Sequence, residues 1–130
     1  MEQERDDIQH WITVSDYDYE TAGAMLSSGR YVYVIFCCQQ AVEKRLKAVI
    51  AQKTSKMPPK IHDLQKLATL AEWEMDAEQN NFLQKLTKYY IETRYPFEIK
   101  DIVQQVDRSL AEKYYQSTGE MLKCIDSLMK

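Results

Sequence analysis

The apolar positions of this chain recur at steps of three and four residues, which is the period of amphipathic helices. Gly29 follows the first such stretch and is typical of a helix stop, and the pair Pro58-Pro59 marks a loop after the second. Pro96 ends the fourth stretch, so residues 94–101 are expected to connect it to the last one. The pattern predicts an all-α helical bundle. The predicted helices span residues 7–28, 31–53, 63–73, 77–93 and about 103 almost to the C-terminus.

Composition agrees with one helical domain over residues 1–130. The chain has only three glycines and three prolines in 130 residues, too few for the many turns of a sandwich or barrel. Its net charge of −3 disfavours binding to duplex DNA, and no uncharged stretch reaches the roughly 18 residues that a membrane span needs. The three cysteines form no even framework, so we expect reduced thiols and a cytoplasmic protein.

A short similarity links the first and last predicted helices. Tyr19, Gly23, Met25 and Leu26 have the same spacing as Tyr115, Gly119, Met121 and Leu122. A glycine inside a helix costs about 1 kcal/mol relative to alanine. We therefore expect each glycine to lie where a neighbouring helix passes close, as part of the core and not of a site.

Several kinds of chemistry are disfavoured by the residues present. Clustered glycines of a phosphate-binding loop are missing, and His10 and His62 belong to no cluster with zinc-ligand spacing. We expect no metal and no cofactor. Cys37 and Cys38 lie in an apolar run, so buried thiols are a better interpretation than a nucleophile.

Three polar segments interrupt the apolar pattern and are the candidate functional positions. Gln39 to Lys44 lies inside the second helix, where Gln40, Lys44 and Lys47 are expected to share a face. The other two are Lys60 to Leu64, with His62 at a helix start, and Tyr89 to Pro96, with Arg94 between tyrosines.

Each segment also has a purely structural interpretation. Glu43 is expected to pair with Arg94 inside the bundle, because a buried guanidinium needs a carboxylate. His62 can cap or pack at the start of the third helix, and the tyrosines can be core or interface residues. No segment alone identifies a site.

Together, the three segments resemble the HEPN domain family (higher eukaryotes and prokaryotes nucleotide-binding). The resemblance rests on Gln-Gln-Ala-Val-Glu-Lys at 39–44, His-Asp-Leu at 62–64 and Tyr-Tyr-x-x-Thr-Arg-Tyr-Pro at 89–96. It implies an antiparallel up-and-down helical bundle, here of four long helices plus one short helix, that commonly forms dimers. Nine tyrosines also favour a homodimer, since tyrosine is enriched at interfaces.

Many members of the HEPN family resemble the ribonuclease toxins of toxin–antitoxin pairs. This chain departs from the sequence motif of those toxins. Their Arg-x4–6-His motif would place a histidine at residues 99–101, which are Ile, Lys and Asp here. Arg94 remains, but the group that transfers the proton is missing. Arg5 and His10 have the required spacing, but they lie away from the family's position. Family members without the histidine resemble a branch encoded beside small nucleotidyltransferases.

The resemblance therefore implies a non-catalytic module that binds a nucleotide or RNA end, a small nucleotidyltransferase partner, or both. The expected ligand-binding residues are Arg94, Lys44, Lys47 and His62 for polar contacts and Tyr90 or Tyr95 for stacking. One alternative is a toxin-like ribonuclease with a displaced catalytic group, for which His62 near Arg94 is the candidate. The other is a purely structural dimerisation module.

Overall fold

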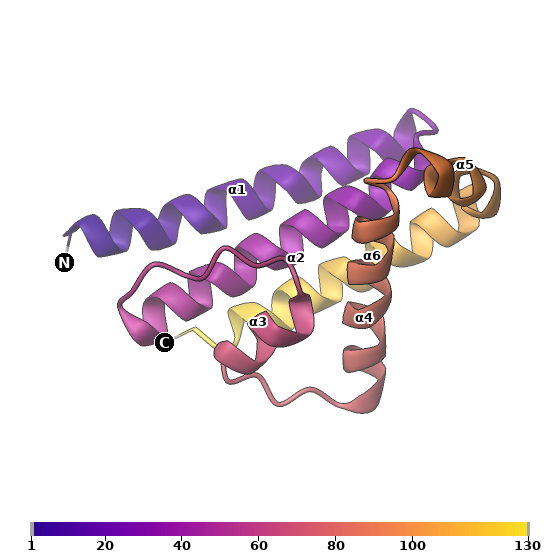
Figure 1. Cartoon of the computed structure of the whole chain (residues 1–130). Coiled ribbons are helices and arrows are strands. Elements are labelled where there is room, and N and C mark those ends of the chain that lie inside the picture. Colours follow the sequence, from indigo (N-terminus) through magenta and orange to yellow (C-terminus); the bar gives the residue numbers. More distant parts are fainter. Residues whose placement is uncertain (1, 130) are drawn as a thin grey trace.

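The computed structural model describes the backbone of residues 2–129 and the side chains of residues 7–95 and 100–129. Within this part of the chain, α1 (Glu2–Ser27) lies antiparallel to its neighbours α2 (Tyr31–Thr54) and α6 (Arg108–Asp126), whereas α4 (Ala77–Glu92) crosses them steeply (Figure 1). The expected all-α bundle is confirmed, although it has two short helices and not one. The helices are α1 (Glu2–Ser27), α2 (Tyr31–Thr54), α3 (Leu64–Leu70), α4 (Ala77–Glu92), α5 (Pro96–Gln105) and α6 (Arg108–Asp126).

The second helix begins and ends within one residue of its predicted bounds, whereas the first ends one residue early and begins at Glu2, five residues before its predicted start. Gly29 has φ +78°, a left-handed conformation that glycine adopts without steric cost, so the chain reverses there between α1 and α2. At its other end α2 stops at Ser55, which also has a positive φ of 57°.

Side-chain caps set the start of the next two helices. The Asp63 carboxylate accepts hydrogen bonds from the backbone N–H groups of Gln65 and Lys66 at the start of α3. Asp76 and Gln79 form a reciprocal capping box at the start of α4. α3 ends at Leu70, before the predicted Trp73, because Glu72 adopts a positive φ of 59° and the Lys53 ammonium donates to the Ala71 carbonyl at 2.8 Å.

The prediction for residues 94–107 is wrong. Pro96 does not only end a helix. It is also the first residue of α5, where a backbone N–H would have no acceptor within the helix, so its missing N–H removes no hydrogen bond. The predicted fifth helix is instead broken at Val106, which has extended backbone, and Asp107 caps α6 by accepting from the N–H of Leu110 at 2.9 Å. As a result Val103, where the last helix was expected to begin, is exposed, whereas Ile102 is buried.

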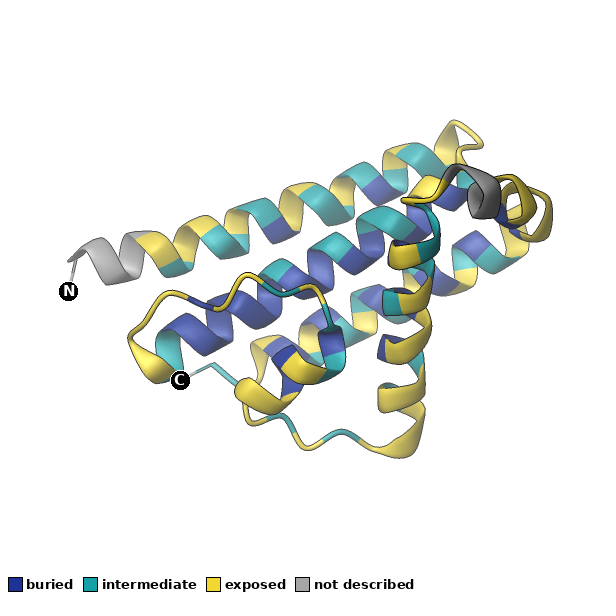
Figure 2. Ribbon diagram, viewed as in Figure 1, coloured by how far each residue is buried: buried dark blue, intermediate teal, exposed yellow. Residues whose placement is uncertain are grey.

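The core is organised around α2, which packs against α1, α3, α4 and α6. Fifteen of its 24 residues are buried, so almost every face of this helix is covered by a neighbour (Figure 2). Four buried polar residues lie on it among the apolar ones: Gln39, Glu43, Arg45 and Lys47. Because burying such groups is costly unless they are paired, their partners define the polar chemistry of the interior.

Tyr19 and Tyr115 explain the similarity between the first and last helices. Their rings stack with centroids 4.6 Å apart, and the Tyr19 hydroxyl donates to the Tyr115 carbonyl at 2.9 Å. A Cβ on Gly119 would lie 2.5 Å from the Tyr19 hydroxyl oxygen, and a Cβ on Gly23 would lie 3.0 Å from that of Tyr115. The expectation that a neighbouring helix passes close to each glycine is confirmed.

Candidate functional site

The fold brings the three polar segments together. Glu43 lies in the middle of α2, His62 directly precedes the cap of α3, and Tyr90 and Arg94 lie at the end of α4. Because α3 and α4 both pack against α2, residues separated by about fifty positions meet at one place. We call Glu43, His62, Tyr90 and Arg94 the histidine–arginine cluster.

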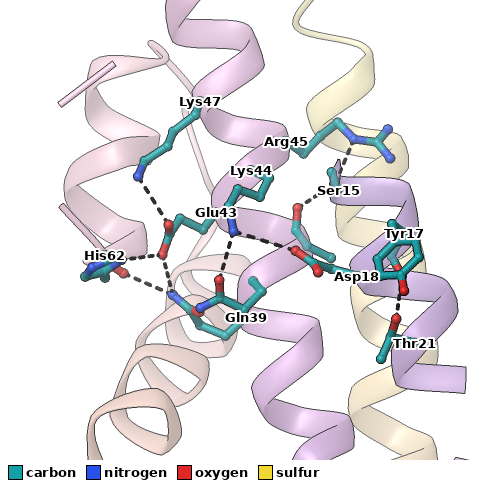
Figure 3. A network of polar contacts seen from close by, with 12 residues as sticks. Ser15, Tyr17, Asp18, Thr21, Gln39, Glu43, Lys44, Arg45, Lys47 and His62 are labelled. Atoms are coloured by element: carbon teal, nitrogen blue, oxygen red, sulfur yellow. Dashed lines mark hydrogen bonds and ion pairs between the residues drawn. The ribbon is translucent and has the colours of Figure 1, made fainter. Parts of the chain in front are cut away.

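Glu43 is the buried anchor of this cluster, with 2% of its side chain exposed. Its carboxylate contacts His62 Nδ1 at 2.9 Å, Lys47 Nζ at 3.2 Å and Gln39 Nε2 at 3.2 Å (Figure 3). Burial raises the pKa of Glu43, but the hydrogen bonds from His62 and Gln39 and the charge of Lys47 outweigh it, so the pKa lies below its usual range. Glu43 is therefore a fixed anion.

This carboxylate orients the His62 ring. An ionised carboxylate only accepts hydrogen bonds, so His62 Nδ1 must donate to it. Gln39 Nε2 also donates to the His62 carbonyl at 3.2 Å, which fixes the backbone of the same residue. With Nδ1 engaged and 48% of the side chain exposed, Nε2 is the ring nitrogen that remains for a ligand.

Tyr90 links His62 to Arg94. Its ring, only 7% exposed, lies 5.2 Å from the His62 ring centroid and 5.5 Å from the Arg94 guanidinium carbon. Phe36 stacks on it at 5.6 Å, and Arg94 Nη1 donates to its hydroxyl at 3.5 Å. The half-exposed His62 imidazole and the exposed Arg94 guanidinium therefore both lie against the ring of Tyr90.

The expected ion pair between Glu43 and Arg94 does not form among the described side chains. α2 presents Lys47 to Glu43 from one turn further along, and His62 occupies the remaining side of the carboxylate. Arg94 is exposed and contacts Tyr90 instead. The guanidinium is thus not neutralised in the core by Glu43.

Both predicted lysines are engaged by other residues of the protein. Lys47, 5% exposed, is bound to Glu43 and lies 5.6 Å from the centroid of the Trp11 ring. Lys44 contacts Gln40 Oε1 at 2.9 Å and lies 3.7 Å from Asp18 Oδ2, so it extends toward α1 and away from His62 (Figure 3). The structure therefore does not bring Lys44 to the cluster, and it places Lys47 there only as a buried counter-charge.

The remaining predicted positions differ in their exposure. Tyr95 is 56% exposed and directly follows Arg94. His10 is exposed on α1, whereas the Arg5 side chain lies outside the described residues, as does that of Ile99. The pair Arg5 and His10 is therefore not tested.

The cysteines are buried as expected, fully for Cys38 and partly for Cys37. Burial, together with the neighbouring Asp18 carboxylate, raises the pKa of Cys37 to about 11. Burial raises the pKa of Cys38 to about 12, despite a hydrogen bond that acts in the opposite direction. Neither sulfur is a thiolate at neutral pH, so neither is an activated nucleophile.

Sequence reasoning missed Arg45, a second buried charge on α2 that is 5% exposed. Its guanidinium donates to Ser15 Oγ at 3.1 Å, to Asp126 Oδ1 at 2.6 Å and to Asp16 Oδ1. These contacts tie α1, α2 and α6 together. The signal was present, because Arg45 lies on the apolar stripe between Val42 and Val49.

The described residues offer neither a metal site nor a membrane-spanning helix. No three His, Cys, Asp or Glu side chains are grouped so that they could hold a metal ion. None of the helices within residues 2–129 has the length and apolar character needed to cross a membrane.

Comparison with known proteins agrees with the fold. The HEPN domain family matches residues 8–128, and the chain belongs to this family. TT1696 from Thermus thermophilus has a similar structure, with a TM-score of 0.76, 23% identity and coverage of 94% of this chain and 98% of that one. ST0689, an archaeal HEPN homologue, gives a TM-score of 0.75, 20% identity and coverage of 95% and 98%. A search of the curated proteins gives no significant match.

Proposed function

We propose that the histidine–arginine cluster is a non-catalytic site for the phosphate of a nucleotide or of an RNA end. The observation that supports it is the exposed Arg94 guanidinium held on the buried Tyr90 ring beside the half-exposed His62. A guanidinium presents planar donors that match phosphate oxygens, and an imidazole beside it adds a hydrogen bond. Glu43 holds the imidazole in place.

Tyr95 supplies the base-stacking surface in this proposal. It is exposed and adjacent to Arg94, and stacking on an aromatic ring contributes about 1–3 kcal/mol per base without strong sequence preference. Lys44 and Lys47 do not touch the ligand. Lys47 acts indirectly, since it balances the charge of Glu43.

We further propose that the module works as a cytoplasmic homodimer and docks a small nucleotidyltransferase. The support for the partner is the absence of a histidine at residues 99–101, which separates the chain from the ribonuclease pattern. The support for a reducing compartment is that Cys37, Cys38 and Cys124 are all unpaired thiols.

Isothermal titration with ATP, GTP and a short RNA tests the binding site. We expect wild-type protein to bind at least one of them and Arg94→Ala to weaken that binding by at least about tenfold, because a charge-assisted phosphate contact is lost. Arg108→Ala is the matched control, since Arg108 is an exposed arginine on α6 that is hydrogen-bonded to Glu112. If wild-type protein binds none of the three, or if Arg94→Ala binds as tightly as wild type, the proposal is wrong.

A ribonuclease with a displaced histidine is the second candidate. It is favoured by the 2.9 Å contact between Glu43 and His62 Nδ1, because a buried carboxylate that fixes one ring nitrogen leaves the other free to accept a proton. In that role His62 would take the proton of a ribose 2′-hydroxyl while Arg94 holds the phosphate. RNA cleaved by wild type but not by His62→Asn would support it, and RNA bound without cleavage would reject it.

A further inference from the structure

A small pocket of about 150 Å³ lies where α5 packs against the start of α2, next to the turn that follows α1. Its floor is apolar, because Val32 and Val106 are buried there. Tyr33 and Val103 also line the pocket, and both side chains are exposed. A site that holds a small molecule on its own usually measures about 300–1,000 Å³. This smaller pocket therefore fits one ring system of a ligand that is anchored elsewhere.

The rim of the pocket carries a free positive charge. Arg30 lines it, and the exposed Arg30 side chain makes no hydrogen bond or ion pair with any described residue. None of the residues that line the pocket is acidic, and residues 21–42 contain neither aspartate nor glutamate. In a chain with a net charge of −3, such a segment favours an anionic ligand. A guanidinium beside an exposed tyrosine is also the combination that Arg94 and Tyr95 form in the cluster.

A row of aromatic rings joins this pocket to the histidine–arginine cluster. Tyr33 and Phe36 lie three residues apart on α2, so they are neighbours on one side of the helix, about one turn or 5.4 Å apart. Phe36 stacks on Tyr90 with ring centroids 5.6 Å apart, and Tyr90 contacts both His62 and Arg94. Figure 1 shows the same proximity in the backbone, since α5 follows the end of α4 and lies near the turn between α1 and α2. The pocket is therefore within reach of a nucleotide next to one held at the cluster.

We propose that this pocket binds the base of a second nucleotide, so that the protein prefers a single-stranded RNA end to a mononucleotide. Tyr33 stacks on that base, and Arg30 contacts the phosphate beside it. The inference rests on the proposed phosphate site at Arg94 and His62, and it adds the length of strand that the protein recognises. A duplex does not bind in this way, because its bases are already paired and stacked.

Isothermal titration with adenosine 5′-monophosphate and with 5′-phosphorylated RNAs of two and four adenosines tests the second base site. We expect the RNAs to bind wild-type protein about tenfold more tightly than the mononucleotide does, which is the gain from one stacked base. Tyr33→Ala should remove that gain and leave the affinity for the mononucleotide unchanged, whereas Arg94→Ala should weaken the binding of all three. Tyr33→Trp keeps a stacking ring and should keep the gain. Tyr17→Ala is the matched control, because Tyr17 is an exposed tyrosine of α1 that does not line the pocket.

The salt dependence of binding tests the phosphate contact of Arg30. Each phosphate that a protein neutralises on a single strand adds about 0.7 to the slope of log affinity against log salt concentration. Arg30→Ala should therefore reduce the slope for the four-adenosine RNA by about 0.7 and leave the slope for the mononucleotide unchanged. An unchanged slope for the RNA would contradict the proposed contact.

The outcomes separate this inference from the proposed function. If wild-type protein binds the mononucleotide and both RNAs equally well, the second base site is wrong and the phosphate site stands. The same holds if Tyr33→Ala binds the RNAs as tightly as wild type, or if Tyr17→Ala loses as much affinity as Tyr33→Ala. If wild-type protein binds none of the three ligands, the phosphate site itself is wrong, and the second base site is rejected with it.

Discussion

The stacked tyrosines between α1 and α6 allow a quantitative prediction for Gly119→Ala. Alanine has the higher helix propensity, worth about 1 kcal/mol, so the substitution would stabilise an isolated helix. In the folded protein the new Cβ would stand 2.5 Å from the Tyr19 hydroxyl oxygen, which is well inside contact distance. That hydroxyl cannot move freely, because it donates to the Tyr115 carbonyl and its ring is stacked on Tyr115.

The expected magnitude follows from what the displaced tyrosine loses. Breaking the hydrogen bond costs about 1 kcal/mol. Disturbing the stack costs up to about 1 kcal/mol more. Set against the gain in helix propensity, Gly119→Ala should lower the free energy of unfolding by about 1 kcal/mol. In a Tyr19→Phe background the hydroxyl is gone, and the same substitution should instead raise it by about 0.5–1 kcal/mol.

Urea denaturation followed by far-ultraviolet circular dichroism measures all four proteins of this double-mutant cycle. Gly23→Ala is the matched comparison, because its Cβ would lie 3.0 Å from the Tyr115 hydroxyl oxygen and the neighbour needs to move less. We expect a smaller cost there. If the effects of Gly119→Ala and Tyr19→Phe simply add, the close approach does not explain the glycine.

Three further predictions concern the polar groups. Asp63→Ala removes the cap of α3 and should cost about 1 kcal/mol in urea melts, whereas Asp63→Asn should cost less. Changing both Asp16 and Asp126 to Asn should destabilise more than Arg45→Met in the same melts, because it leaves a buried guanidinium without a counter-charge; the reverse order would contradict the role given to Arg45. The lowered pKa of Glu43 means that its ionisation stabilises the fold above its ordinary value of 4.5, and that this contribution is lost as the pH falls through the lower folded value. Acid titrations of Glu43→Gln should therefore show a weaker loss of stability below pH 4.5 than wild type, and parallel curves would refute the assignment.

The helix bounds that local signals control were predictable from the sequence. Gly29 and Pro58-Pro59 mark breaks that the structure confirms, since α1 ends at Ser27 and α2 spans Tyr31–Thr54, each within one residue of expectation. The start of α1 and the end of α3 lie five and three residues from their predicted positions. The break at Val106 was not predictable from periodicity, because the apolar stripe continues across it without glycine or proline. Asp107 was the signal that the sequence offered for a new helix start, because aspartate is a preferred N-cap residue and it caps α6.

The candidate residues could be named from the sequence, but their pairings could not. The sequence singles out segments that interrupt apolar faces, and the fold brings Glu43, His62 and Arg94 from these segments to one region. That they bind a ligand stays a prediction. Which cation meets Glu43 depends on the rotation of α2 and on where the chain enters α3, and neither is encoded in local spacing. Lys44 and Lys47 show the difficulty: both reach side chains of α1, Asp18 and Trp11 respectively, but only Lys47 also binds Glu43.

The hydrogen bond from Gln39 to the His62 carbonyl has a consequence for how such chains can diverge. The bond holds the backbone of His62 and therefore the position of its ring. The exposed segment from Ser55 to Met57 can then change without moving the ring. Related proteins can lengthen or shorten that segment and keep the ring where it is, since exposed loops accept insertions when the residues that flank them are anchored. Loss of the glutamine would link the position of the ring to every change in the loop before it.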